Sequence, residues 1–461
     1  MPPMTRSRAA ARASEKQLVV SPVADDEELV PGFHNSISER IFDFLPADER
    51  VRGKAVSPAW RRELSKPKYW KRLELAGVAS RYRRSMLEAA AVHFAGVLES
   101  LSIDGCGADS LWEDDDQDSV PHISHLAFVR ANAESLRELR LCDLGREERT
   151  WDEVDYVLHA APRLTTLVAD VFCDRFAQAH DALSSPSVLR LHRLCLNRGY
   201  DTSPAGQNRL RALAAAVAAY PHESLQELCL VDAPLTTETL GAVVDAALSR
   251  CLTSLRLCSC QLSPDAAPVL VRLLDGGALR KLSVIGINPL LVFSEAAIAN
   301  FAHSLQANCT LIELEWLDDR SVPLPEAAAV LLAACVGHAS LRTLNLRVPV
   351  WPHQQPIVGA VLGALMAANA PALRTLCVSM PLDKEGVAPL LAAMPGNTHL
   401  RELFISTLLV DDAFAAQHLL SAVRVNTSLR RLRVAGPIRF DGGADPVQEA
   451  QELIRRRAAA D

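Results

Sequence analysis

The sequence is poor in aromatic residues, has no excess of positive charge and contains no long apolar run. Aromatic residues make up only 5% of the 461 residues, which indicates a core filled by aliphatic side chains. The formal net charge of −7 and the pI of about 6.0 exclude the overall basic character of a nucleic-acid-binding protein. The longest apolar runs, such as residues 357–368, are too short to span a bilayer. We therefore expect neither a nucleic acid nor a membrane as a partner.

Motifs of catalysis and metal binding are also missing. There is no Gly-x-Ser-x-Gly, no His-Glu-x-x-His and no phosphate loop ending in Lys-Ser/Thr. No pair among the 11 cysteines has zinc-finger spacing, so we interpret them as reduced thiols of a cytoplasmic or nuclear protein. The acidic run 113–118 lies near His122 and His125, but this spacing is weak evidence for a metal site. We predict a non-catalytic protein without a metal ion or cofactor.

What the sequence does contain is a repeat. Apolar residues at relative positions 0, +3 and +5 recur at intervals of mostly 27 to 34 residues. Their first members are Leu98, Leu136, Leu164, Leu191, Leu225, Leu252, Leu279, Leu311, Leu341, Leu373, Leu400 and Leu429. The last two positions of each triplet have the spacing of one face of a strand. A dozen such triplets at this period indicate a solenoid.

Residues 252–274 show the repeat unit most clearly. Leu255 and Leu257 mark a short strand, and an i, i+1, i+4, i+5 apolar set within residues 269–274 marks an amphipathic helix. Ser263-Pro264-Asp265 between them provides a capped helix start. One strand and one helix cannot bury their apolar faces alone. The unit therefore predicts a stack of strands backed by helices.

Residues 98–440 resemble a leucine-rich-repeat horseshoe of the ribonuclease-inhibitor-like kind, in which a full helix follows each strand. The resemblance rests on the Leu-x-x-Leu-x-Leu openings and on Cys260, which stands at the Asn/Cys position of the family motif. Ala233, Pro349 and Pro381 depart from the motif at that position. The resemblance implies an α/β solenoid with parallel strands on the concave face and helices on the convex face.

Residues 29–75 form a second informative stretch. An apolar helical stripe ends at Pro46, and Ser57-Pro58 begins a later helix that carries Trp60. Between them a second helix would bury Val51, Ala55 and Val56. Three helices in under fifty residues would be a marginal domain by themselves. We therefore expect this module to need contacts with a partner or with the adjoining domain to be stable.

This stretch resembles an F-box, the helical module that docks onto the Skp1-type adaptor of a cullin ubiquitin ligase. The matching blocks are Ile41-Phe42-x-x-Leu45-Pro46, Val56-Ser57-Pro58-Ala59-Trp60-Arg61 and Tyr69-Trp70-x-x-Leu73-x-Leu75. Val30-Pro31 stands a few residues early for the usual Leu-Pro opening, and Arg50 and Gly53 replace preferred leucines. The F-box positions carried over as adaptor-binding, some of which must be core, are Ile37, Ile41, Phe42, Leu45, Pro46, Val56, Trp60 and Trp70. The alternative is a plain helical cap on the first repeat.

The residues between the core leucines of the predicted strands form the candidate partner-binding surface. This surface is acidic around Glu313 and basic around Arg431, with Phe404 as the best anchor because exposed aromatics and arginines dominate binding hot spots. The predicted partner-binding residues are Glu313, Glu315, Arg347, Phe404, Arg431 and Arg433.

The sequence thus divides into five parts. We predict a disordered tail (1–28), the helical module (29–75), a linker helix (76–97), the solenoid of about twelve repeats (98–440) and a C-terminal capping helix (441–461).

The two resemblances together imply the substrate-recognition subunit of an SCF-type ubiquitin ligase. The F-box would bind the Skp1-like adaptor, and through it a cullin, while the horseshoe would bind a protein substrate. A non-catalytic scaffold or regulator of protein partners remains an alternative. A GTPase-activating horseshoe is a further one, although no residue marks the catalytic polar group that it would need.

Overall fold

The computed structural model divides the chain into two compact units, residues 1–70 and 71–461. The residues that it describes are 49–50, 54, 56–74, 95–104, 125–142, 157, 160–170, 191–197, 203–220, 224–286, 293–317, 327–347, 354–407, 411–435 and 445–460. The predicted tail (1–28) and acidic run (113–118) lie outside them, as do residues 76–94 of the predicted linker helix. Residues 95–97 form a turn.

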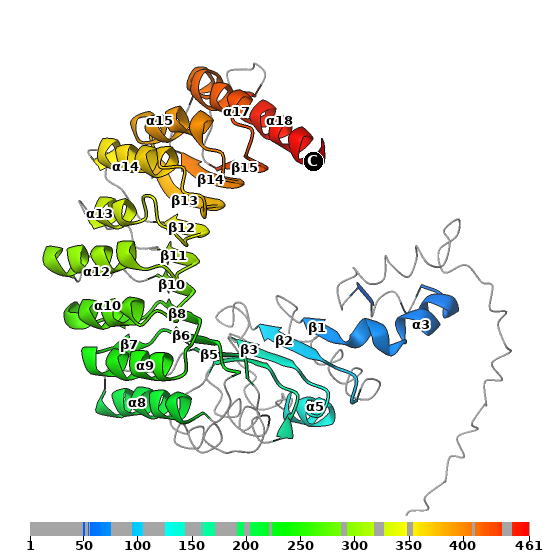
Figure 1. The fold of residues 1–461 in the computed structure, drawn as a ribbon. Coiled ribbons are helices and arrows are strands. Elements are labelled where there is room, and N and C mark those ends of the chain that lie inside the picture. The colour runs from blue at the N-terminus through cyan, green and yellow to red at the C-terminus, as the bar shows by residue number, and fades with distance from the viewer. Residues whose placement is uncertain are drawn as a thin grey trace, which may run out of the picture. The chain divides into compact units, whose positions relative to one another are not determined.

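The larger unit contains a sheet of thirteen parallel strands within its described residues (Figure 1). The strands are β1 (Arg72–Glu74), β2 (Ser100–Asp104), β3 (Glu138–Cys142), β4 (Thr166–Asp170), β5 (Arg193–Asn197), β6 (Glu227–Val231), β8 (Ser254–Cys258), β10 (Lys281–Ile285), β11 (Glu313–Leu317), β12 (Thr343–Arg347), β13 (Thr375–Leu382), β14 (Glu402–Thr407) and β15 (Arg431–Ala435). They pair in chain order. Short strands β7 (Pro234–Leu235) and β9 (Gln261–Leu262) form a separate pair. Because each of the thirteen strands pairs only with the nearest strands of the same sheet along the chain, the predicted α/β leucine-rich-repeat solenoid is confirmed as the architecture of this unit.

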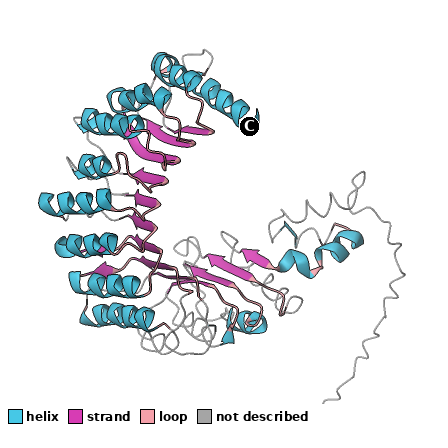
Figure 2. Cartoon of the chain, viewed as in Figure 1, coloured by secondary structure: helices cyan, strands magenta, loops and turns pink. Residues whose placement is uncertain are grey.

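Helices connect most of the strands and cover one face of the sheet (Figure 2). They are α5 (His125–Asn132), α8 (Pro204–Ala219), α9 (Thr237–Ser249), α10 (Ala267–Asp275), α12 (Glu295–Ala307), α13 (Ala327–Ala334), α14 (Gln355–Ala367), α15 (Lys384–Ala393), α16 (Asp412–Phe414), the π-helix η7 (Ala415–Leu420) and α17 (Ser421–Val425). A last helix, α18 (Pro446–Ala460), ends the described chain. We call the opposite face, over which no described helix of this unit lies, the open face.

The leucine triplets form the core between sheet and helices. Each of the twelve predicted triplets marks a strand: its first residue lies two positions before the strand and the other two lie within it. The triplet residues are buried except Val434, which is half-buried, and Ile103, whose side chain lies outside the described set. Strand register places equivalent leucines side by side, as in Leu228, Leu255 and Leu282. Burying one such side chain stabilises the fold by about 1.5–3 kcal/mol. The repeated leucines are therefore the main source of cohesion between neighbouring repeats.

β1 is a strand that the sequence analysis did not separate from the helical module. Trp70, Leu73 and Leu75 have the 0, +3, +5 spacing of the repeats, with tryptophan in the first place. Leu73 is buried and pairs with Leu101 of β2. Residues 72–74 therefore belong to the sheet, and the smaller compact unit ends at Trp70.

The described part of the smaller unit contains the predicted third helix, α3 (Pro58–Leu64), followed by the 3₁₀ turn η1 (Pro67–Trp70). Ser57 caps α3, since its Oγ accepts a hydrogen bond from the backbone N–H of Trp60 at 3.1 Å. The Trp70 indole donates to the carbonyl of Leu64 at 2.6 Å. The first predicted helix, with Ile37, Ile41, Phe42, Leu45 and Pro46, lies outside the described residues.

A buried polar side chain repeats in the turns that join a helix to the next strand. Asn308 donates from Nδ2 to the carbonyl of Leu274 at 2.7 Å, and its Oδ1 accepts from the backbone N–H of Leu311 at 2.7 Å. Asn397 and Asn426 make equivalent bonds. Each side chain thus ties a turn to the helix end of the preceding repeat, which satisfies carbonyls that a helix end leaves free. The sequence analysis did not identify this feature.

Candidate protein-binding face

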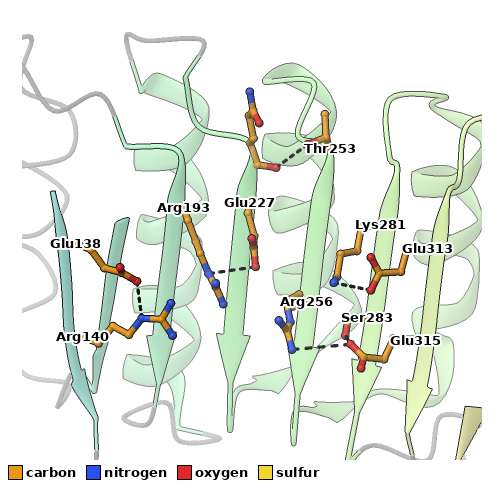
Figure 3. A network of polar contacts seen from close by, with 11 residues as sticks. Glu138, Arg140, Arg193, Glu227, Thr253, Arg256, Lys281, Ser283, Glu313 and Glu315 are labelled. Atoms are coloured by element: carbon orange, nitrogen blue, oxygen red, sulfur yellow. Dashed lines mark hydrogen bonds and ion pairs between the residues drawn. The ribbon is translucent and has the colours of Figure 1, made fainter. Parts of the chain in front are cut away.

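The open face consists of side chains at the first and third positions of the strands, which the register aligns in two rows. Around the centre of the sheet the first-position residues are Arg193, Glu227, Ser254, Lys281 and Glu313, and the third-position residues are Cys195, Cys229, Arg256, Ser283 and Glu315. Figure 3 shows this part of the face. Charged residues of opposite sign stand on adjacent strands, so the face is polar without being dominated by either sign.

Ion pairs link the first row across neighbouring strands. Arg193 Nε lies 3.2 Å from Glu227 Oε1, and Lys281 Nζ lies 2.6 Å from Glu313 Oε1 (Figure 3). These pairs are half-buried, and even exposed ion pairs contribute only about 0–1 kcal/mol each. Their main effect is to fix the positions of the long side chains. Glu313, one of the predicted partner-binding residues, is thereby partly neutralised within the chain.

Glu315 is the centre of a network in the third row. Ser283 donates a hydrogen bond to Glu315 from β10, Asn345 Nδ2 donates to Glu315 Oε1 at 3.2 Å from β12, and Arg256 Nη2 lies 3.9 Å from Glu315 Oε2 (Figure 3). The Glu315 side chain is only 15% exposed. This predicted partner-binding residue is therefore held by neighbouring side chains and presents little of its own surface to a partner.

Several buried polar atoms of the same area have no hydrogen-bond partner. They are Arg193 Nε, Glu227 Oε1, Ser254 Oγ, Arg256 Nε and Asn345 Oδ1. The first two lie 3.2 Å apart but lack hydrogen-bond geometry. Unsatisfied buried polar atoms are uncommon in proteins and are typical of places that bind water or a ligand. The centre of the open face thus retains hydrogen-bonding capacity.

An apolar patch with two thiols interrupts the third row on β4, β5 and β6. Val168, Cys195 and Cys229 are buried together, and Val231 and Cys258 pack against them. A hydrogen bond with Cys195 and burial raise the pKa of the Cys229 thiol to about 12, although a hydrogen bond with Cys258 lowers it. Because the thiolate is the reactive form, Cys229 is a packing residue of this patch. The described cysteines are all free, and no group of His, Cys, Asp or Glu side chains in the described residues is arranged to hold a metal ion.

The predicted anchor lies at the C-terminal end of the open face. Phe404 is half-buried and stands in register between Cys377 of β13 and Arg433 of β15. Arg431 and Arg433 are both exposed. Arg431 Nη1 lies 3.1 Å from Glu402 Oε1, and 71% of the Arg431 side chain remains exposed. The exposed Arg347 ends β12 on the same face. The six predicted residues therefore all belong to β11, β12, β14 and β15.

The described members of the predicted adaptor-binding set have different environments. Val56 is 65% exposed, Trp60 is half-buried, and Trp70 is buried with Lys54 Nζ 4.8 Å from its ring centroid. Tyr69, beside Trp70, donates to Glu63 Oε1 at 2.9 Å. Val56 has the exposure of a contact, and the prediction that the second helix buries it is wrong. Trp70 has the burial of a core residue, a distinction that sequence alone does not make.

The fold and its surface can be set beside known proteins. No helix in the described part of the chain is long and apolar enough to cross a membrane. No family model and no curated protein matches the chain. Among solved structures, it is similar to an internalin from Listeria monocytogenes, with 14% sequence identity, coverage of 88% of this chain and 92% of that chain, and a TM-score of 0.35. The leucine-rich-repeat architecture is evident in this chain itself, in its strand register and its buried leucine triplets.

Proposed function

We propose that this chain is the substrate-recognition subunit of an SCF-type ubiquitin ligase. Its N-terminal module would bind a Skp1-like adaptor, and through it a cullin, and its open face would bind the protein substrate. The observation that carries the proposal is the open face, a wide parallel sheet with polar side chains and no described helix over it. A broad face of this kind suits a protein partner better than a small ligand, which needs a concave pocket. The F-box resemblance of residues 29–75 supports the adaptor half.

In this role the chain supplies no reacting group. It holds the substrate and the ligase core in one complex, so that the substrate meets the activated ubiquitin at a high effective concentration. Affinity and geometry, not acid–base chemistry, are then the properties that mutations alter. The tests below therefore measure binding.

Adaptor capture by the full-length chain tests the N-terminal half. We expect the chain to retain a Skp1-type adaptor, and Val56→Asp to weaken that binding by about tenfold or more, because losing one apolar contact of about 1.4 kcal/mol has this effect. Val425→Asp changes an equally exposed valine on α17 and should leave binding unchanged. Failure of the folded wild-type chain to retain any adaptor would contradict the ligase assignment and favour the scaffold alternative.

Substrate capture tests the other half. Affinity isolation from the native cell, followed by mass spectrometry, identifies bound proteins, and we expect Phe404→Ala combined with Arg433→Ala to reduce the captured substrate several-fold. The matched control is Ile357→Ala, which truncates an exposed apolar side chain on α14, on the helical side of the sheet. Equal losses in the two variants would show that Phe404 is not an anchor.

A further inference from the structure

We propose that the edge of the sheet at which β10 to β15 begin binds an extended, acidic segment of a partner protein. The feature that carries this inference is the arginine row, which we define as Arg280, Arg342, Arg374, Arg401 and Arg430. Each of these residues immediately precedes a strand, and among β10 to β15 only β11 has a different residue, Ile312, in this place. If the function proposed above holds, the acidic segment belongs to the substrate.

The main chain holds the row as one rigid line. Ile312 donates its N–H to the carbonyl of Arg280 at 2.7 Å, and Arg342 donates to Ile312 at 2.7 Å. Arg374 donates to Arg342, Arg401 to Arg374, and Arg430 to Arg401, each at 2.8 Å. Neighbouring strands lie about 4.8 Å apart, so the row extends over about 24 Å.

Four of the five arginines of the row are not neutralised by an ion pair within the described residues. Arg280, Arg342, Arg374 and Arg401 are exposed and take part in no ion pair within the described residues. The turns that lead into β11 to β15 contain neither Asp nor Glu, and these turns are residues 308–311, 338–341, 369–373, 397–400 and 426–429. Like charges on adjacent strands repel each other. An anionic ligand along this edge would relieve that repulsion.

Two of the guanidinium groups are held in place by the next turn. Arg374 Nη1 donates to the carbonyl of His399 at 2.9 Å, and Arg401 Nη1 donates to the carbonyl of Ser428 at 3.0 Å. A guanidinium carries five N–H donors, so each group keeps several for a ligand. Its planar fork matches a carboxylate in a bidentate arrangement. The row is therefore positioned in advance for carboxylates.

Arginine at this position is concentrated in the C-terminal strands, although Arg137 precedes β3 and Lys71 precedes β1 in the same place. At the same position before β4, β5, β6 and β8 stand Thr165, His192, Gln226 and Thr253. Leucine-rich repeats thus fold in this chain without an arginine there. The clustering on β10 to β15 is consequently not a requirement of the repeat.

The chemistry favours an acidic peptide over a nucleic acid. The chain has a net charge of −7, and neither the row nor the five turns contains a Phe, Tyr or Trp on which a base could stack. An extended peptide advances about 3.3 Å per residue, so about seven residues span the row.

Fluorescence anisotropy with the full-length chain and a labelled heptapeptide of alternating Glu and Ser tests the inference. An exposed charge pair changes affinity by about two- to fivefold. We therefore expect the change of Arg280, Arg342, Arg374 and Arg401 to Gln to weaken binding by about tenfold or more and to reduce its salt dependence. The same four residues changed to Lys should retain most of the salt dependence.

The control removes four arginines of the helices, Arg211, Arg272, Arg424 and Arg455, which are paired with acids. Unchanged peptide affinity in this variant, with loss in the row variant, supports the inference. It is overturned if the row variant binds the peptide as well as the wild type does, if a neutral Gln/Ser peptide binds equally, or if a single-stranded oligonucleotide binds more tightly at this edge. Because adaptor capture does not involve the row, a failure here is distinguishable from a failure of the ligase proposal.

Discussion

At the scale of single residues, His338 shows how one repeat differs from the others. It occupies the turn position that Asn308, Asn397 and Asn426 fill elsewhere. Its Nε2 lies 3.0 Å from the carbonyl of Leu305, and its Nδ1 accepts the N–H of Leu341 at 3.2 Å. Both bonds together require the neutral ring with its proton on Nε2, the tautomer that these partners assign. Burial lowers the pKa of His338, although the hydrogen bond to Leu305 raises it.

We therefore expect His338 to make folding sensitive to acid. In the unfolded chain the pKa of a histidine is about 6.5, so as the pH falls through this value the unfolded state binds a proton that the folded state resists. The stability present above about pH 6.5 is then lost on acidification, at about 1.4 kcal/mol per unit by which folding lowers the pKa. His338→Asn should remove this part of the pH dependence, as measured by urea unfolding at neutral and acidic pH.

The control for this experiment is His303→Asn, which changes an exposed histidine on α12. It should leave the difference in unfolding free energy between the two pH values as it is in the wild type. The hypothesis would be wrong if His338→Asn and His303→Asn lost the same stability on acidification.

The residue scale is also where prediction from sequence was least complete. Val56 and Trp70 belong to the same family motif, yet one is exposed and the other buried. Glu315 was predicted as a contact from its place in a strand, but its partners Arg256 and Asn345 come from other repeats. Such pairings depend on which strands become neighbours and in which register. A single sequence does not contain that information directly.

At the scale of elements, α14 and α15 pack closely against each other at two glycines of α14. A Cβ on Gly359 of α14 would lie 2.6 Å from the carbonyl oxygen of Gly386, and one on Gly363 would lie 2.9 Å from Pro389 Cβ. The distances are too short for any side chain, and the nearest atoms include backbone that cannot swing aside. These glycines therefore permit the close approach of the two helices, at the cost of weaker helix propensity.

Gly359→Ala should destabilise the protein even though alanine is the better helix former. Overpacking a close contact costs about 1–3 kcal/mol, which exceeds or cancels the gain of about 1 kcal/mol in helix propensity. Gly241→Ala in α9 is the matched substitution with the opposite sign, because the nearest atom to its Cβ would be Arg272 Nη2 at 3.9 Å. We expect it to stabilise by up to about 1 kcal/mol. Thermal and urea unfolding measure both, and destabilisation by both would refute the packing argument.

Elements with a strong period were predicted well, and those without one were not. The twelve triplets located their strands because two inward leucines per strand leave a clear signal. β1 was assigned to the helical module because its triplet begins with Trp70 and overlaps the F-box motif. Ser263 was found as a cap, but the 3₁₀ turn η4 (Pro264–Ala266) that precedes α10 was not. A short 3₁₀ turn and the first turn of an α-helix share the same capping residues, so composition does not distinguish them.

At the scale of the whole molecule, the larger unit depends on contacts between neighbouring repeats, so its ends need protection. α18, predicted as the cap, lies against β15 and η7 and buries Val447, Ala450 and Ile454. Arg457 donates hydrogen bonds to the carbonyls of Val423 and Asn426 at the end of α17. A solenoid requires such a terminal element because its last repeat otherwise exposes an apolar side.

The packing of α18 on the last repeat predicts where a destabilised chain opens first. Ile454→Ala removes a buried side chain and should cost about 2–5 kcal/mol locally. In a chain of nearest-neighbour repeats this loss should open the C-terminal repeats first, so hydrogen exchange should accelerate in β14 and β15 while β6 and β8 keep their protection. Arg456→Ala, which removes an exposed arginine that pairs with Glu452 of the same helix, should change neither. Equal acceleration across all strands would mean instead that the sheet unfolds as one cooperative block, and α18 would then stabilise every repeat alike.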